Sequence, residues 1–297
     1  MAERNFREML AKRQQKINSL VCVGLDPLPD KLPDCVARSC TNPIAEKVMF
    51  WMRNIVKATA PFASMFKPQR AHWEAMIKGE EALRLLIHYI REKHPDIPVF
   101  LDCKRGDIDR TQERYRVAHF DLDGADGVNF SPYMGKSCMA GLVDPNHLGR
   151  ALVGLCYTSN PSARQIQDLS SYGYSGTRLW EIIAQFTLEW AKELGVVENA
   201  GLVMAAAYEN PKGSGEVYSQ HLKRCRALVG DKLWFLIPGI GTQGGFIEET
   251  VKAAYAGPGS IAINSSSEII FAGSGEYYAT DAAKKAEELR DAINSAL

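Results

Sequence analysis

Aspartate and lysine side chains end three short apolar runs of the sequence, and their types suit acid–base and electrostatic chemistry. Asp26 ends the first run, Lys67 the second, and Asp102 and Lys104 the third, with Asp107 three residues further on. Residues two apart on a strand share a face, so Asp102 and Lys104 are predicted to point the same way. A lysine kept charged by neighbouring carboxylates can stabilise a developing negative charge and then donate a proton. Each residue alone could form an ordinary surface ion pair, but ionic groups at strand ends are costly unless paired, and this favours a paired cluster.

A second group of residues is suited to holding an anion. Residues 238–245 read PGIGTQGG and follow the seventh apolar run, whereas residues 264–267 read NSSS and follow the eighth. Glycines such as Gly241 let backbone N–H groups approach an anion closely, and a nearby helix N-terminus adds a positive dipole. Ser266 and Ser267 would add hydroxyl donors. A glycine-rich turn is weak evidence alone, but the loops after strands seven and eight of a (β/α)8 barrel often bind phosphate.

The elements that must position these residues alternate along the chain. We predict strands at residues 20–25, 62–66, 98–102, 127–130, 151–156, 201–206, 233–237 and 260–264. We predict helices at residues 43–60, 80–94, 111–120, 176–194, 214–229 and 276–296. Apolar strands that alternate with helices favour a parallel sheet buried on both faces. Eight such units predict an α/β fold, a single (β/α)8 TIM barrel with its active site at the carboxyl ends of the strands. The alternative, an open Rossmann-like sheet, lacks its GxGxxG motif after the first strand.

Length and composition agree with one barrel. The 297 residues are predicted to form a single domain, with residues 1–18 as an N-terminal helical extension, and residues 27–43 and 159–175 as long βα loops. Lysine plus arginine and aspartate plus glutamate each total 35, so the balanced charge gives no reason to expect nucleic acid or a membrane as partner. The seven cysteines show no metal-binding spacing, which favours reduced thiols and no metal. Without an apolar leader in the first 18 residues, we expect a cytoplasmic protein.

Six motifs in order along the chain resemble the orotidine 5′-monophosphate decarboxylase family, in its longer bacterial-type branch. They read GLDPLP at 24–29, FKPQ at 66–69, FLDCKRGDI at 100–108, SPYMG at 131–135, YTSNP at 157–161 and PGIGTQGG at 238–245. The resemblance covers nearly the whole chain. It implies a carboxy-lyase that converts orotidine 5′-monophosphate to uridine 5′-monophosphate in de novo pyrimidine biosynthesis, without metal or organic cofactor.

The resemblance also implies roles for the charged residues. Lys104 would protonate C6 of the pyrimidine, and Asp102 would lie beside the substrate carboxylate. Lys67 and Asp107 would complete an alternating charge network. Asp107 and Thr111 would reach the active site of a neighbouring subunit, so a homodimer with shared sites is implied. The parent protein could also be a fusion with orotate phosphoribosyltransferase.

The remaining contacts implied by the resemblance concern the nucleotide. Asp26 and Lys67 would contact the ribose, Ser159 the pyrimidine edge, and Gln243 the phosphate. Gly241 and Ser266 belong to the two loops predicted to bind the phosphate.

Ser267 departs from the family pattern, which has a phosphate-binding arginine at this position. The change removes a bidentate, charge-assisted contact. Arg70, Lys136 and Arg164 are candidate replacements between which the sequence does not choose. Ser267 therefore leaves open a nucleotide-binding variant with impaired phosphate binding. A second alternative is a related magnesium-dependent sugar-phosphate aldolase, because such relatives share the barrel and the DxKxxD string.

Overall fold

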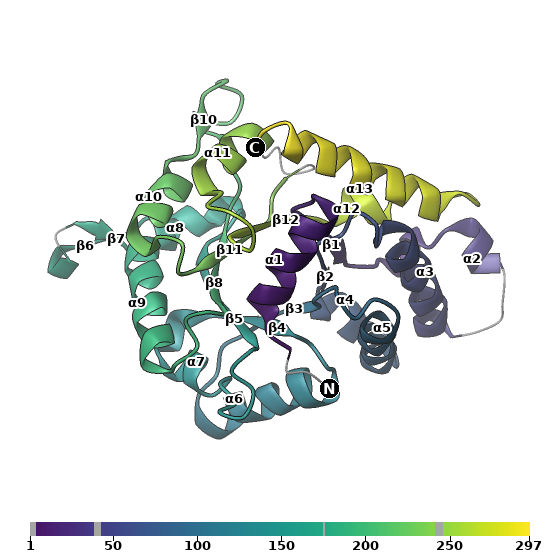
Figure 1. Ribbon diagram of the computed structural model, residues 1–297, viewed down its shortest axis with the longest axis horizontal. Helices are drawn as coiled ribbons and strands as arrows, with labels where there is room; N and C mark the ends of the chain where they lie inside the picture. The colour runs from purple at the N-terminus through teal and green to yellow at the C-terminus, as the bar shows by residue number, and fades with distance from the viewer. Residues whose placement is uncertain (1–3, 39–42, 175, 241–245) are drawn as a thin grey trace.

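Eight parallel strands form the centre of the computed structural model, which describes residues 4–38, 43–174, 176–240 and 246–297 (Figure 1). The strands are β1 (Val21–Leu25), β2 (Met65–Pro68), β3 (Phe100–Arg105), β4 (Gly127–Phe130), β5 (Ala151–Tyr157), β8 (Ala200–Met204), β11 (Trp234–Ile237) and β12 (Ile261–Ser265). Their order is β2-β1-β12-β11-β8-β5-β4-β3, so β2 and β3 are the two ends of one curved sheet. These ends meet through isolated bridges that pair Phe66 with Val99 and Gln69 with Asp102. The predicted (β/α)8 barrel is thus confirmed, and all eight predicted strands are present.

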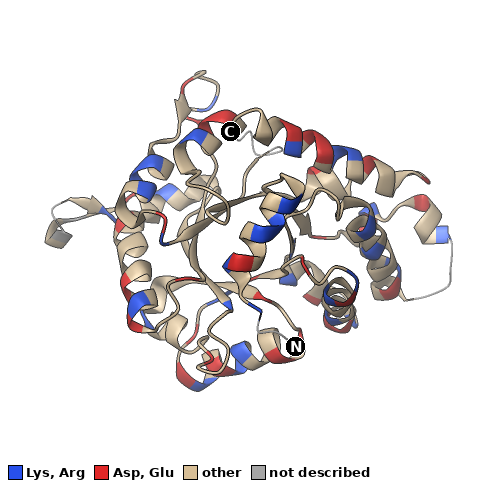
Figure 2. Cartoon of the chain, viewed as in Figure 1, with Lys and Arg blue, Asp and Glu red and all other residues tan. Residues whose placement is uncertain are grey.

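Helices surround the barrel because each buries one apolar stripe against the strands (Figure 1). The longer ones are α3 (Ile44–Thr59), α5 (Gly79–Lys93), α6 (Asp109–Arg116), α9 (Leu179–Glu193), α10 (Gln220–Val229), α11 (Ile247–Ala254) and α13 (Tyr278–Asn294). In α3, for example, Val48, Trp51 and Ile55 are fully buried at helical spacing. Lysine, arginine, aspartate and glutamate are intermixed on the outer helices (Figure 2). Among the described residues, no helix is long and apolar enough to cross a membrane.

Helix α1 (Phe6–Ile17) lies across the amino-terminal end of the barrel (Figure 1). Its first residue, Phe6, is fully buried and stacks on Trp234 with ring centroids 5.0 Å apart. The Arg13 guanidinium donates to the carbonyl oxygens of Ala60 and Ala63, and this ties the helix to the segment before β2. This end of the barrel is therefore filled with side chains, and the carboxyl ends of the strands face the opposite side.

The structure differs from the predicted elements in four places. Helix α10 begins six residues later than the predicted start at 214, because the chain first forms a hairpin of β9 (Tyr208–Glu209) and β10 (Val217–Tyr218). The predicted helix 111–120 is split into α6 and a π-helical turn η2 (Val117–Leu122). Helix α11 was not predicted at all. The predicted helix 176–194 begins at Leu179, after a small hairpin of β6 (Ser170–Ser171) and β7 (Thr177–Arg178).

Short elements fill the loops at the carboxyl ends of the strands. They are η1 (Pro29–Lys31), α2 (Asp34–Arg38), α4 (Arg70–Glu74), η3 (Pro132–Met134), α7 (Ser137–Ala140), η4 (Pro161–Ala163), α8 (Arg164–Gln167), β6 (Ser170–Ser171), η5 (Tyr172–Tyr174), β7 (Thr177–Arg178) and α12 (Ser267–Ile270). The predicted long loops 27–43 and 159–175 therefore contain short helical turns and part of a hairpin.

Candidate active site

Four charged side chains from three adjacent strands meet at the carboxyl end of the barrel. Asp102 lies between two lysines: its Oδ2 is 3.2 Å from Lys67 Nζ and its Oδ1 is 2.6 Å from Lys104 Nζ. Lys67 Nζ also lies 3.9 Å from Asp26 Oδ2. Lys67 is 3% exposed, whereas about half of the Lys104 side chain is open to solvent. The buried ammonium is thus flanked by two carboxylates, and the second ammonium is held by one of them but faces outward.

Burial and charge act against each other on these groups. Burial lowers the pKa of the Lys67 ammonium, but Asp26 and Asp102 outweigh this effect and raise the pKa above its usual range. Burial likewise raises the pKa of the Asp102 carboxyl, but Lys67, Lys104 and a hydrogen bond from Asn129 together bring the pKa far below its usual range. Both groups are therefore charged throughout the physiological range.

Asn129, in the middle of β4, holds the third strand in place and was missed by the sequence analysis. Its Nδ2 donates to Asp102 Oδ1 at 2.7 Å, and its Oδ1 accepts from the backbone N–H groups of Cys103 (2.9 Å) and Lys104 (2.7 Å). Lys104 has a left-handed backbone with φ of 47°, which is uncommon for a residue other than glycine. A polar residue inside an apolar strand is the sequence signal that could have revealed Asn129. In the structure its side chain is buried, with 1% exposed, and such groups need hydrogen-bond partners.

A cavity of about 670 Å³ opens beside this charge cluster. Lys67, Asp102, Lys104 and Asn129 form its polar wall, and Ser159 of the loop after β5 also lines it. Its remaining wall is largely apolar and includes Leu155, Ile183, Val203, Leu236 and Trp180. Cavities of roughly 300–1,000 Å³ with a few converging polar groups are typical of small-molecule sites. The structure therefore brings Lys67, Asp102, Lys104 and Ser159 to one cavity, with Asp26 directly behind Lys67.

The two loops predicted to bind phosphate are described in part. Gly241 and Gln243 lie outside the described residues. After β12, the Ser266 hydroxyl packs against Gly24 so closely that a Cβ atom on Gly24 would lie 1.8 Å from Ser266 Oγ. Ser266 Oγ also accepts from Asn264 Nδ2 at 3.3 Å, whereas Ser267 is exposed at the first position of α12. Gly24 thus allows β1 and the end of β12 to approach, and Ser267 has room for a larger side chain.

Asp107 and Thr111 do not join the cluster within one chain. Asp107 Oδ1 accepts from the backbone N–H of Ile108 at 2.8 Å, and among the described residues Asp107 makes no ion pair with Lys104. Thr111 is exposed in the first turns of α6. Both residues are accessible at the surface beside the site.

The three cations offered as replacements for the phosphate-binding arginine have different surroundings. Arg70 is buried and committed to the carboxylates of Glu74, Glu80 and Asp123, so it is not available to a phosphate. Lys136 pairs with Glu193 at 2.8 Å on the surface. Arg164, on α8 after β5, donates to Asn210 Oδ1 at 3.0 Å and lies 4.4 Å from the centre of the Tyr208 ring. Arg164 thus links the loops after β5 and β8.

A (β/α)8 barrel with an alternating lysine–aspartate cluster and a cavity at the carboxyl ends of its strands defines a class of barrel enzymes. A family model described as "Orotidine 5'-phosphate decarboxylase / HUMPS family" matches residues 19–289. The chain belongs to this family.

Relatives and solved structures agree with the assignment. The chain is 39% identical over 291 residues to the orotidine 5′-phosphate decarboxylase of Cupriavidus necator, with 97% of each chain covered. It is 40% identical over 295 residues to the enzyme of that name from Bordetella avium, with 98% of this chain and 99% of that one covered. The putative orotidine-monophosphate decarboxylase structure from Toxoplasma gondii matches with a TM-score of 0.80 and 28% identity over 98% of both chains. The Leishmania donovani UMP synthase matches with a TM-score of 0.74 and 28% identity, over 97% of this chain and 57% of that one.

Proposed function

We propose that this chain decarboxylates orotidine 5′-monophosphate to uridine 5′-monophosphate in de novo pyrimidine biosynthesis. The observation that carries the proposal is the Lys67–Asp102–Lys104 cluster, with an ammonium group on the wall of a cavity of nucleotide size. Family membership and relatives with this name over 97% of their length support the same reaction.

In the proposed mechanism, the bond between C6 and the carboxylate breaks heterolytically and carbon dioxide leaves. The electron pair stays on C6, where the Lys104 ammonium stabilises it and then donates its proton; solvent returns a proton to the lysine. Asp102 keeps Lys104 in position through the 2.6 Å contact and lies beside the substrate carboxylate. Because the charges are arranged before the substrate arrives, little reorganisation is needed during the reaction. No metal or organic cofactor takes part in this scheme.

The rest of the nucleotide would be held by residues around the cavity. We assign Asp26 and Lys67 to the ribose and Ser159 to the pyrimidine edge. The phosphate would be bound by the loops that contain Gly241, Gln243, Ser266 and Ser267. Binding energy from the phosphate, far from the breaking bond, can then be used to close loops over the site.

The test is to follow the ultraviolet absorbance of orotidine 5′-monophosphate with the purified protein, with and without a metal chelator. We expect turnover that the chelator does not change, and its loss in Lys104→Ala without loss of uridine 5′-monophosphate binding. A folded protein that binds the product but does not turn over the substrate would identify the nucleotide-binding variant instead. Turnover that withstands the chelator would count against a magnesium-dependent sugar-phosphate aldolase.

We further propose a cytoplasmic homodimer in which Asp107 and Thr111 complete the partner's site. The exposed position of Thr111 and the lack of an Asp107–Lys104 contact within the described chain support this arrangement. Inactive Lys104→Ala and Asp107→Ala proteins, unfolded together and refolded in equal amounts, should recover about a quarter of wild-type activity, because half the dimers are mixed and each mixed dimer has one intact site. No recovery would mean that each chain builds its own site. A fusion with orotate phosphoribosyltransferase in the parent protein stays a hypothesis.

A further inference from the structure

The two end strands of the sheet, β2 and β3, meet along a seam, and the proposed catalytic charges lie there. In the described structure, each of the other seven pairs of neighbouring strands shares a ladder of at least three residue pairs, two of them with a register shift. In contrast, β2 and β3 meet through the isolated bridges of Phe66 with Val99 and of Gln69 with Asp102. Lys67 lies on one side of this seam, and Asp102 and Lys104 lie on the other. A shift of one strand along the other would therefore change the 3.2 Å contact between Lys67 and Asp102 directly.

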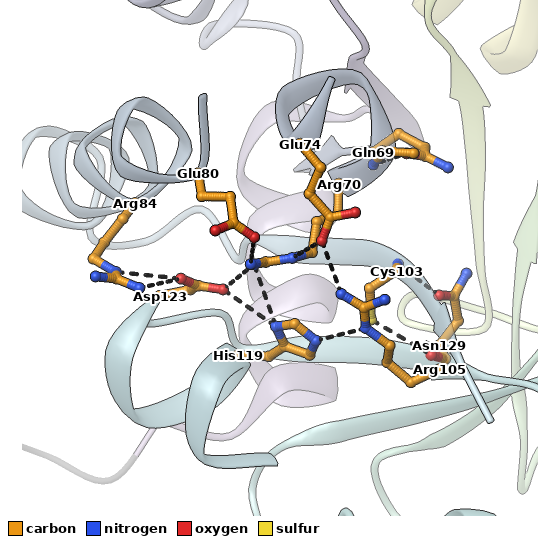
Figure 3. Close-up of polar contacts among 11 residues, drawn as sticks. Gln69, Arg70, Glu74, Glu80, Arg84, Cys103, Arg105, His119, Asp123 and Asn129 are labelled. Atoms are coloured by element: carbon orange, nitrogen blue, oxygen red, sulfur yellow. Dashed lines mark hydrogen bonds and ion pairs between the residues drawn. The ribbon is translucent and has the colours of Figure 1, made fainter. Parts of the chain in front are cut away.

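An ion-pair network closes the outer side of the seam (Figure 3). Arg70 follows β2, Arg105 ends β3, and both donate to the same oxygen of Glu74, at 2.7 Å from Arg70 Nε and 3.0 Å from Arg105 Nη2. A single carboxylate thus joins the guanidinium group that follows β2 to the one that ends β3. Arg105 also lies over the Tyr115 ring of α6, 4.5 Å from its centre.

His119 forms a second link between the same two arginines (Figure 3). Arg105 Nε donates to His119 Nε2 at 3.1 Å, so this nitrogen carries a lone pair, and His119 Nδ1 then donates to Asp123 Oδ2 at 3.2 Å. Asp123 Oδ2 also accepts from Arg70 Nη1. Burial lowers the pKa of His119 and so favours the neutral ring that this arrangement needs. His119 lies on the π-helical turn η2, and such turns occur frequently at functional sites.

We propose that Arg105 and His119 are positioning residues: with Glu74, Asp123 and Arg70 they lock β2 against β3 and thereby set the distance between the catalytic lysines and Asp102. This inference rests on the proposed function. Arg105 directly follows Lys104, whose left-handed backbone sits in a register irregularity of β3 between Leu101 and Arg105. Without its anchors, the Lys104–Arg105 segment could relax to a regular strand and turn the Lys104 side chain away from Asp102.

The experiment compares His119→Leu, which removes both hydrogen bonds, with His119→Gln, whose amide oxygen can still accept from Arg105. Arg105→Lys keeps the positive charge that faces Glu74, but it loses the planar guanidinium group, whose N–H groups reach His119 and Glu74 at the same time. A misplacement of about 1 Å costs roughly 10²-fold, so we expect kcat to fall by about 10- to 100-fold in His119→Leu and Arg105→Lys, with KM changed by less than about threefold. His119→Gln should recover most of kcat.

Arg4→Leu serves as the matched control. Arg4 makes a two-pronged ion pair with buried Asp126, at 2.7 and 2.8 Å, near the amino-terminal end of the barrel. It should lower thermal stability like the seam variants but leave kcat of the folded protein unchanged. The inference is wrong if His119→Leu and Arg105→Lys keep full kcat, or lose no more than Arg4→Leu. Lack of turnover by the wild-type protein would instead contradict the proposed function, and this separates the two failures.

Discussion

Replacing Asp102 with asparagine is the sharpest test of the charge cluster, because it removes one charge and almost no volume. Asp102 Oδ2 lies 3.2 Å from the buried Lys67 ammonium, and at an effective dielectric constant of about 20 this attraction amounts to roughly 5 kcal/mol. Removing one partner of a buried pair typically costs about 3–5 kcal/mol. We expect the loss of stability to stay within this range, because Asp26, whose Oδ2 lies 3.9 Å from Lys67 Nζ, still compensates the ammonium charge. The contact with Lys104 adds little to stability, since that side chain is half exposed. With about 2 °C per kcal/mol, Tm should fall by roughly 6–10 °C.

The effect on catalysis should exceed the effect on folding. Lys104 loses the carboxylate that holds its ammonium at 2.6 Å, and the loss of one preorganised electrostatic contact costs about 10²–10³ in kcat. Denaturant unfolding and steady-state turnover of orotidine 5′-monophosphate measure the two effects separately. Asp126→Asn is the matched control: Asp126 is 1% exposed, pairs with Arg4 and Arg150, and lies outside the cavity. It should lose similar stability but keep its kcat. A folded Asp102→Asn protein with kcat within about tenfold of wild type would refute the assigned role.

Three further outcomes are expected. Folding lowers the pKa of Asp102, so its contribution to the free energy of unfolding is present above about pH 4 and is lost as the pH falls further. Folding raises the pKa of Lys67, so its contribution is lost only above about pH 10. The difference in unfolding free energy between wild type and Asp102→Asn should hence be flat from about pH 5 to 9 and shrink at both extremes, and a steady slope across neutral pH would contradict this. Asn129→Leu should lower kcat more than about tenfold, because the Lys104 backbone loses its acceptor; an unchanged kcat would show that β3 keeps its shape unaided. Ser267→Arg should lower KM more than it changes kcat, and an unaltered KM would mean that the phosphate is bound elsewhere.

The barrel could be predicted because its signal is carried by continuous apolar strands. Each of the eight predicted strands overlaps an observed one, since a strand buried on both faces must be apolar along its length. Helix starts were less accurate. The hairpin of β9 and β10 is held by the Glu209 carboxylate, which accepts from the N–H groups of Gly213 and Gly215, and such a local turn leaves no periodic pattern.

The candidate site was predictable in its charges but not in its supports. Charged residues at strand ends stand out in a sequence, and the structure brings Lys67, Asp102 and Lys104 together. Asn129 was missed because one amide in an apolar strand has no spacing that links it to Lys104. Arg70 is a candidate phosphate ligand in the sequence, but the structure buries it among carboxylates of α4, of α5 and of Asp123, which directly follows η2. Partners 10 and 53 residues away cannot be paired from one sequence.

The proposed chemistry and the proposed phosphate binding depend on different elements of the barrel. The charges that we propose to act at the breaking bond lie on β2 and β3. Asn129 of β4 contacts Asp102 and the Lys104 backbone, and the proposed arginine network joins the same two strands on their other side. The loops predicted to bind the phosphate follow β11 and β12. After β12, Ser267 is exposed, and within the described residues it makes no ion pair or side-chain hydrogen bond with the charge cluster. We therefore expect a serine in place of an arginine at this position to weaken phosphate binding without disturbing the lysines or Asp102. A weaker phosphate grip should act on substrate affinity and on loop closure, while the charge geometry at C6 stays intact.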